Sequence, residues 1–258
     1  MRLMKRILSA AAVLALSASL LVGCSSGTAS SVPVSASSAA ESTVSSVEET
    51  ASSAVDENEA AAAQLLNDLT GSYQELWPVI LADEYKQTWL DDCTALVGEE
   101  NAEAAFEKLS SMVTSDVYGE DAVEAYANGG GAYFCGFTNS LATLTFDGET
   151  STISGTDKDG NVLFSHAYHY IGMEPVRGLY EFESDAADSG EFTYFFLAPD
   201  TSAETYHIEF RYGSDAEALS QYDAGEYAYW LASGISTDCD QTMIDNCIEL
   251  FCTENLAG

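Results

Sequence analysis

Basic residues are scarce in this 258-residue sequence, in which eight Lys or Arg stand against 42 Asp or Glu. Three of the eight, Arg2, Lys5 and Arg6, lie in the first six positions. The rest of the chain holds five basic residues against all 42 acidic ones, a formal charge of −37. Such a chain repels nucleic-acid phosphates and anionic lipid headgroups, and it attracts cations. The composition therefore excludes nucleic acid as a partner and excludes docking to a membrane through a basic surface.

Motifs of common enzyme classes are also missing. The sequence has no Gly-x-Ser-x-Gly elbow, no phosphate-binding loop, no dinucleotide-binding fingerprint and no His-Glu-x-x-His motif. We therefore predict that the protein is not an enzyme. Hydrophobic residues are not scarce, because they make up 47% of the chain, with 11% aromatic residues. That is enough to bury a sizeable core, so the acidic composition does not indicate a disordered protein.

The N-terminus is typical of an exported bacterial lipoprotein. A basic start is followed by an apolar run from Ile7 to Val22, which is shorter than a typical membrane-spanning helix and typical of a signal peptide. The run ends in Leu-Val-Gly-Cys, which resembles a lipobox ending at Cys24. We predict a signal peptide over residues 1–23, lipidation of Cys24, and anchoring of the exported protein to the outer face of the cytoplasmic membrane.

Composition divides the rest of the chain into a tether and a folded domain. Residues 24–61 are rich in Ser and Ala and contain no aromatic residue, so burial cannot offset the entropy of ordering them. We predict a disordered tether there and one domain over residues 62–258. Helical patterns over 61–127 give way to short β-rich runs over 131–213, and a terminal helix is expected from Asp240 to about Asn255. This order predicts an α+β fold in which helices flank a small, closed or strongly curved antiparallel sheet.

The three histidines, His166, His169 and His207, all fall among the predicted strands. Imidazole is a common ligand of zinc-like ions. Strand alternation places His207 and Glu209 on one face, where both can reach one ion. Arg211 shares that face and offers Glu209 an ion pair instead, so both interpretations stay open.

His166 and His169 are three residues apart, so a regular strand points them to opposite faces and only one of them can join His207. The simpler explanation is that all three histidines are ordinary polar residues of strands.

The segment Asp157-Lys-Asp-Gly-Asn161 matches the first residues of a calcium-binding loop, but Tyr168 stands where such a loop needs its bidentate Glu. We therefore expect a hairpin turn at residues 157–161.

Five cysteines follow Cys24: Cys93, Cys135, Cys239, Cys247 and Cys252. Export permits disulfides, and none of the five has zinc-ribbon spacing. Cys247 and Cys252 lie five apart on one predicted helix and point in different directions, so they do not pair with each other. A bridge between helices, from Cys93 to either of them, is compatible with the pattern. The odd number leaves at least one free thiol.

Several segments in the same order resemble the ZinT/AdcA-type zinc-binding domain of exported bacterial proteins. They are Leu66–Pro78 with its Gly-Ser-Tyr-Gln and Trp-Pro, Gly178–Glu183, Phe192–Pro199, Tyr206–Phe210 and the aromatic stretch from Gly225. The resemblance implies a lipocalin-like (calycin) barrel flanked by helices. It also implies zinc binding outside the cytoplasm in support of an uptake transporter.

The resemblance further implies three ligand positions, which fall on Phe195, Thr205 and His207. Only His207 can ligate zinc as a histidine, and Zn²⁺ needs about four ligands. Glu209, His166 or His169, or else Glu204, must therefore rebuild the site if zinc is bound. We predict an extracytoplasmic lipoprotein that binds Zn²⁺ or a related divalent cation and serves metal uptake, with a metal ABC transporter as partner, or metal buffering. The alternative is a calycin module on the cell envelope that binds a small molecule or peptide without metal.

Overall fold

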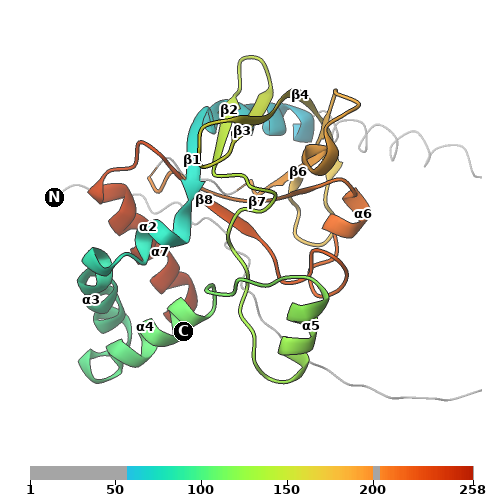
Figure 1. The fold of residues 1–258 in the computed structure, drawn as a ribbon. Coiled ribbons are helices and arrows are strands. Elements are labelled where there is room, and N and C mark those ends of the chain that lie inside the picture. The colour runs from blue at the N-terminus through green and yellow to red at the C-terminus, as the bar shows by residue number, and fades with distance from the viewer. Residues whose placement is uncertain (1–56, 200–203, 258) are drawn as a thin grey trace, which may run out of the picture. The chain divides into compact units, whose positions relative to one another are not determined.

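A computed structural model describes residues 57–199 and 204–257 (Figure 1). The predicted signal peptide, Cys24 and the tether as far as residue 56 lie outside the described residues. Eight antiparallel strands close into a barrel in chain order, with β1 paired to both β2 and β8. The strands are β1 Gly71–Glu75, β2 Thr143–Asp147, β3 Thr152–Thr156, β4 Val162–Met173, β5 Tyr180–Ser184, β6 Tyr194–Leu197, β7 His207–Gly213 and β8 Ala232–Ser236. The barrel confirms the predicted fold class.

The β3–β4 hairpin confirms the turn expected at residues 157–161. The Asp157 carboxylate accepts the backbone N–H groups of Asp159 and Asn161 at 2.9 and 2.8 Å. Gly160 has a φ of 81°, which glycine adopts without steric cost. The acidic residues of this segment therefore belong to a turn that the Asp157 side chain stabilises.

Strands β1 and β8 were not expected from the sequence, because both lie in stretches with helical patterns. Tyr73 of β1 pairs with Leu144 of β2 and with Ser236 of β8, so β1 closes the barrel. Both strands have five residues, and Ala232–Ser236 contains mostly small side chains. Tertiary pairing, rather than local propensity, decides the conformation of such short segments.

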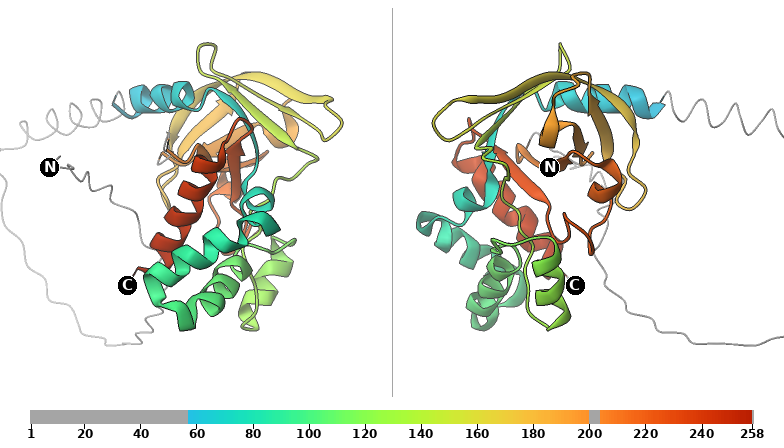
Figure 2. Two further views of the ribbon diagram at one scale, coloured as in Figure 1. Left: turned by 90° about the vertical axis from the view of Figure 1, so that its left-hand side faces the viewer. Right: turned by 45° about the vertical axis from the view of Figure 1, so that its right-hand side comes forward.

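Aromatic rings fill the barrel interior. Phe195 lies 5.4 Å from Tyr212 and 6.4 Å from Phe210 between ring centroids, and all three side chains are fully buried. A helix over residues 57–68 adds Leu65 and Leu66 to the same core. Figure 2 shows this helix lying along one end of the barrel. Its first turn includes residues 57–61, which composition assigned to the tether.

Four further helices form a second core beside the barrel, which we call the helical lobe. It comprises α2 Leu76–Ile80, α3 Lys86–Val97, α4 Ala102–Ser111 and α7 Gln241–Leu256, with 3₁₀ turns at Asp83–Tyr85 and Glu99–Asn101. The lobe packs against the outer side of β8 through Ile235. Its terminal helix α7 confirms the helix expected from residue 240.

Three elements outside the helical lobe complete the described chain: α5 Glu120–Ala127, α6 Ala216–Leu219 and a 3₁₀ turn at Gly190–Phe192. In Figures 1 and 2 the helical lobe lies at the end of the barrel away from the helix over 57–68. Across the described ranges, no helix has both the length and the apolar character needed to cross a membrane.

Candidate metal site

Strand β7 carries the residues from which the sequence predicted a site. Ile208, Phe210 and Tyr212 point into the barrel and are at most 1% exposed. The alternate residues of β7 therefore face outward, among them His207 and Glu209, which are both partly buried. The structure places the predicted pair on one face of one strand.

The start of β7 is fixed by the helical lobe. Asn246 of α7 donates to the carbonyl of Glu204 at 2.8 Å, and the Cys247 thiol donates to the carbonyl of Thr205 at 3.3 Å. The Thr205 hydroxyl in turn lies 2.5 Å from Nδ1 of His207. A hydrogen bond to one ring nitrogen fixes the orientation of an imidazole, as is common for histidines that bind metals.

Glu209 lies near a cysteine that the sequence did not connect with it. Glu209 pairs with Ser233 of β8, whose backbone N–H donates to the carbonyl of Cys135 at 3.0 Å. Burial raises the pKa of the Cys135 thiol to about 12, and the charge of Glu209 contributes in the same direction. Cys135 therefore remains protonated at neutral pH in the absence of a metal ion.

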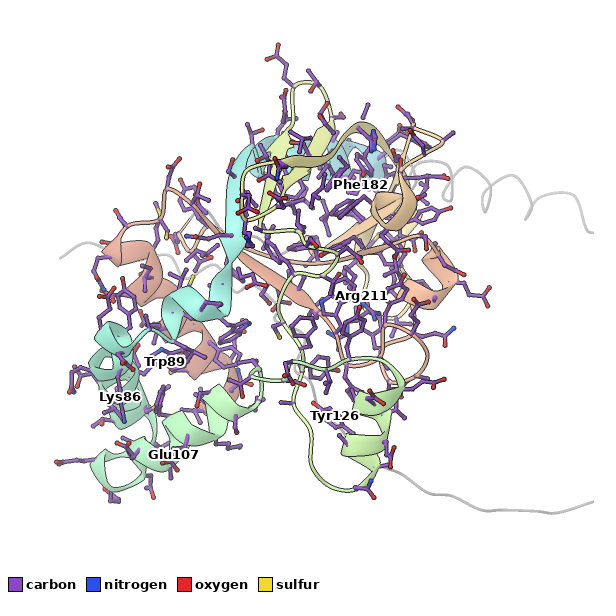
Figure 3. All side chains as sticks on the ribbon, viewed as in Figure 1. Lys86, Trp89, Glu107, Tyr126, Phe182 and Arg211 are labelled. Carbon is purple, nitrogen blue, oxygen red and sulfur yellow. The ribbon has the colours of Figure 1, made fainter. Side chains whose placement is uncertain are left out.

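Among the ion pairs of the described residues there is none between Arg211 and Glu209, which the strand pattern had left open. Its guanidinium is fully buried and donates to the backbone carbonyls of Leu219, Gln221 and Tyr227. Within the described part of the chain no carboxylate lies within ion-pair distance of it, and its Nε has no hydrogen-bond partner. Burial lowers the pKa of Arg211 to about 10, so the side chain stays charged at neutral pH. Figure 3 shows Arg211 among the segments beside the barrel.

Both arginines beyond the first six residues meet at one tyrosine. The guanidinium carbons of Arg177 and Arg211 lie 4.2 and 4.3 Å from the centroid of the Tyr222 ring. Cation–π attraction offsets part of the cost of burying Arg211. The carboxylate of Glu174, which is also fully buried, accepts the backbone N–H groups of Val176 and Arg177. No local sequence pattern predicts this cluster, because its members come from distant segments.

His166 and His169 point to opposite faces of β4, as their spacing predicted. His166 shares the inner side with the buried Phe164, and their ring centroids are 6.1 Å apart. His169 faces outward, where its Nδ1 lies 2.7 Å from a carboxylate oxygen of Asp185. The side chains of His169 and Asp185 are 54% and 60% exposed, so this pair lies in solvent.

The barrel register separates these histidines from His207. His169 on β4 pairs in register with Glu183 on β5, which pairs with Tyr194 on β6, which in turn pairs with Gly213 on β7. Gly213 is six residues from His207 along β7. Three strand spacings of about 4.8 Å add to that offset. Over the ranges the structure describes, no group of three or more His, Cys, Asp or Glu side chains is arranged to hold a metal ion.

The other two ligand positions that the resemblance implies, Phe195 and Thr205, lie in different places relative to His207. Phe195 is fully buried inside the barrel, opposite Tyr212 in register, whereas His207 lies outside. Thr205 contacts His207 through its hydroxyl. Three ligands at these positions do not converge in this chain, so the residues present do not fit a three-histidine zinc site.

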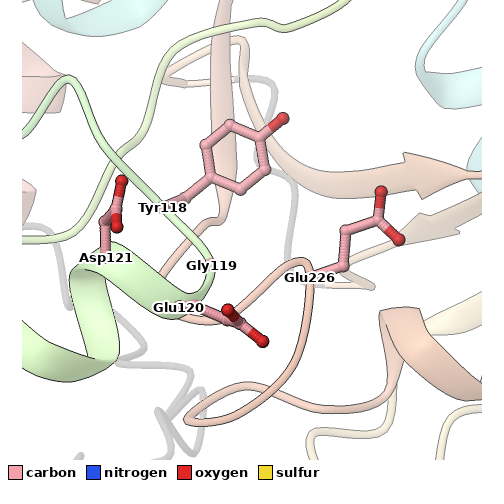
Figure 4. Close-up of a pocket in the computed structure, with 5 residues that line it drawn as sticks. All are labelled: Tyr118, Gly119, Glu120, Asp121 and Glu226. Carbon is pink, nitrogen blue, oxygen red and sulfur yellow. The ribbon is translucent and has the colours of Figure 1, made fainter.

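An open hollow of about 480 Å³ lies outside the barrel at the start of α5 (Figure 4). It is lined by Tyr118, Gly119, Glu120, Asp121 and Glu226. Burial, followed by the charge of Glu226, raises the pKa of Tyr118. The lining contains carboxylates but no histidine, so it adds no ligand to the predicted set.

Comparison with known proteins identifies structural neighbours. No protein-family profile and no curated protein matches the sequence. Among solved structures, the fold is similar to the Zn(II)-bound ZinT-like domain of Streptococcus pneumoniae AdcA, with 14% identity and a TM-score of 0.44. That match covers 70% of this chain and 87% of the other. Zn(II)-bound AdcA from the same organism matches 71% of this chain at 12% identity and a TM-score of 0.41, and the match spans 34% of AdcA.

Proposed function

We propose that this protein is an exported lipoprotein that binds a divalent metal ion at the outer face of β7, with His207 and Glu209 as its protein ligands. The observation that supports the proposal most is that these two side chains share one face of one strand at partly buried positions. Imidazole nitrogen and carboxylate oxygen are both ligands of zinc-like ions. The Thr205 hydroxyl at Nδ1 orients the ring of His207.

Such a site is weak compared with a three-histidine site. In the described arrangement neither His166 nor His169 lies beside His207 and Glu209 to complete it. Zinc sites with three or four protein ligands are tighter and more selective. Weak, exchangeable binding suits buffering or delivery of a metal better than permanent storage. A metal ABC transporter in the same membrane is the partner that we propose for delivery.

The proposed location rests on the N-terminus. The basic start, the apolar run and the Leu-Val-Gly-Cys ending at Cys24 support export and lipid anchoring. The charge of −37 beyond that start favours the accumulation of cations near the protein. A small-molecule site inside the barrel has less support, because aromatic rings fill that interior.

Isothermal titration of the full chain with Zn²⁺ in 150 mM salt tests the metal proposal, since salt screens diffuse attraction to the acidic surface. We expect one stoichiometric site that disappears in His207→Ala and in Glu209→Gln. His169→Ala is the matched control, because it removes an exposed histidine elsewhere on the barrel, and it retains the site. Equal weak binding by all four proteins would leave only surface attraction and would end the proposal.

Export is tested separately by mass spectrometry of the protein recovered from membranes. We expect a mature N-terminus at Cys24 carrying lipid, and release of the protein from membranes in Cys24→Ala. An unprocessed chain that begins at Met1 in the wild type would contradict the lipoprotein proposal without affecting the metal test.

A further inference from the structure

Cys93 of α3 and Cys252 of α7 face each other inside the helical lobe. Both side chains are fully buried, and their sulfur atoms lie 3.9 Å apart. The two residues are 159 positions apart in the chain. They lie in the same core as Trp89 and Ile248, which are also fully buried. The fold therefore brings together two thiols from opposite ends of the domain.

The geometry selects Cys252 over Cys247 as the neighbour of Cys93. Five residues along an α-helix correspond to a rotation of about 140° around its axis. Cys252 accordingly faces α3, whereas Cys247 donates to the carbonyl of Thr205 at the start of β7. A disulfide needs a sulfur–sulfur distance of about 2.05 Å, so the two thiols must approach by roughly 2 Å. Side-chain rotation contributes to such an approach, and the backbones of two neighbouring helices already hold the two residues together.

We propose that Cys93 and Cys252 form a disulfide in the exported protein, which makes the bond a covalent link between α3 and α7. The proposal rests on the proposed export, because disulfides persist outside the cytoplasm and are reduced within it. Nothing in it depends on metal binding.

The bond forms by thiol–disulfide exchange with an external disulfide donor, either an exported dithiol–disulfide oxidase or a small disulfide such as oxidised glutathione. One cysteine attacks the donor as a thiolate and gives a mixed disulfide. The other then attacks the sulfur of the first, forms the Cys93–Cys252 bond and releases the donor in its reduced form. The donor disulfide bond breaks, and the donor takes up the two electrons and the two thiol protons, so that it leaves as a dithiol or as two thiols.

The exchange takes place before the lobe is packed. Burial raises the pKa of both thiols in the folded chain, and protonated thiols are poor nucleophiles. Helix α7 is the last helix of the described chain and takes part in no strand pairing. Both cysteines are therefore reactive while α7 is undocked, and the closed lobe protects the bond once it has formed.

Peptide mapping of the full chain tests the pairing. The protein is recovered from cells without reductant, its free thiols are blocked with N-ethylmaleimide in denaturant, and it is cleaved after Glu for mass spectrometry. We expect a Cys93–Cys252 cross-linked peptide that disappears on reduction, with N-ethylmaleimide on Cys247. Cys247→Ser, the matched control on the same helix, keeps the cross-link, whereas Cys252→Ser loses it and exposes Cys93 to the label.

A second arm separates the pairing from export. The reduced wild-type chain is refolded in a glutathione redox buffer and mapped in the same way. The Cys93–Cys252 cross-link as the dominant product supports the pairing, and a different partner for Cys93, or labelled Cys93 and Cys252, overturns it. In protein from cells, free Cys93 and Cys252 in chains processed at Cys24 overturn the proposal. Free thiols in chains that keep residues 1–23 count against export instead, and the refolding arm then decides the pairing.

Discussion

The barrel and the helical lobe bury their apolar residues in different ways. The barrel core is rich in Phe and Tyr and contains no cysteine, whereas the lobe core contains four buried cysteines, Cys93, Cys135, Cys247 and Cys252. Eight paired strands hold the barrel through its backbone. The lobe consists of helices of at most 16 residues, which depend on tertiary packing for stability. The difference indicates that the lobe, and not the barrel, gains from a covalent link.

The largest effect is expected on the barrel side, at Arg211. Arg211→Ala removes the donor for the carbonyls of Leu219, Gln221 and Tyr227, and it leaves the carbonyls of the buried Leu219 and Tyr227 without that donor. We expect a loss of about 3–5 kcal/mol in the free energy of unfolding, because each buried carbonyl left without a donor costs roughly 1–3 kcal/mol and the packing of the long side chain is lost as well. Urea denaturation followed by circular dichroism measures it.

Lys158→Ala is the control for charge alone, because the Lys158 side chain is 83% exposed. It should change the free energy of unfolding by less than about 0.5 kcal/mol. An Arg211→Ala protein as stable as Lys158→Ala would show that the buried guanidinium does not hold residues 219–227 in place.

The second effect concerns the lobe. Reduction of the proposed Cys93–Cys252 bond should lower the stability of the lobe by about 2–4 kcal/mol, since the bond restricts the unfolded chain. Tryptophan fluorescence separates the two regions, because Trp77 and Trp89 lie in the lobe core and Trp230 lies in the barrel core. Trp230→Phe therefore reports on the lobe alone.

In Trp230→Phe, reductant should lower the urea midpoint of the fluorescence change. When Cys247→Ser is combined with Trp230→Phe, reductant should still lower the midpoint. When Cys252→Ser is combined with Trp230→Phe, reductant should have no effect on it. An unchanged midpoint in reductant would mean that no disulfide stabilises the lobe, and that the two cores do not differ in this respect.

The third effect appears at alkaline pH and belongs to the barrel. Burial raises the pKa of Tyr212 well above its ordinary value of 10.0. Between the unfolded and folded pKa values the unfolded chain has lost the hydroxyl proton and the folded chain has kept it. Stability contributed by the tyrosine is thus complete below pH 10 and falls as the pH rises further, by about 1.4 kcal/mol per pH unit for one fully buried hydroxyl.

Tyr212→Phe removes this titration together with the hydrogen bonds to Thr138. It is therefore expected to be less stable at pH 8 but to lose less stability above pH 10 than the wild type. Urea unfolding at several pH values measures both slopes, and parallel slopes would contradict the assignment to Tyr212.

The smallest effect is expected at the exposed pair on β4. His169→Ala removes the contact with Asp185, but both side chains are more than half exposed. We expect a loss below about 1 kcal/mol that shrinks further in high salt. Asp185→Asn serves as the paired control, and a loss near that of Arg211→Ala would contradict the view that this face of the barrel is merely solvated.

The fold was largely predictable because its central strands carry a clear pattern. Alternation from Tyr206 to Tyr212 identified the buried face of β7, although Tyr206 itself lies before the strand and is 37% exposed. The hairpin at 157–161 and helix α7 followed from local residue preferences. Strands β1 and β8 were missed because their short sequences contain no strong local signal, and their partners lie far away in the chain.

The candidate site was predictable only within one strand. Spacing placed His207 and Glu209 on the same face, but it carried no information about which strands are neighbours. The register that separates His169 from His207 comes from closure of the barrel. The acceptors of Arg211 lie at the end of α6 and in the segment that follows it. The path of this segment was not evident in the sequence, so the strand pattern left the ion pair with Glu209 open.

Closure by β1 has a kinetic consequence. Tyr73 and Ser236 pair across 163 positions of the chain, and the lobe helices α2, α3 and α4 lie between β1 and β2. Contacts at such separation carry a high cost in loop-closure entropy and slow folding, whereas helices and hairpins form quickly. Strand β1 is among the first elements to be synthesised, yet it cannot complete its pairing until β8 exists. Until β8 exists, β1 therefore presents an open strand edge, and we expect barrel closure, which joins the two ends of the domain, to come late in folding.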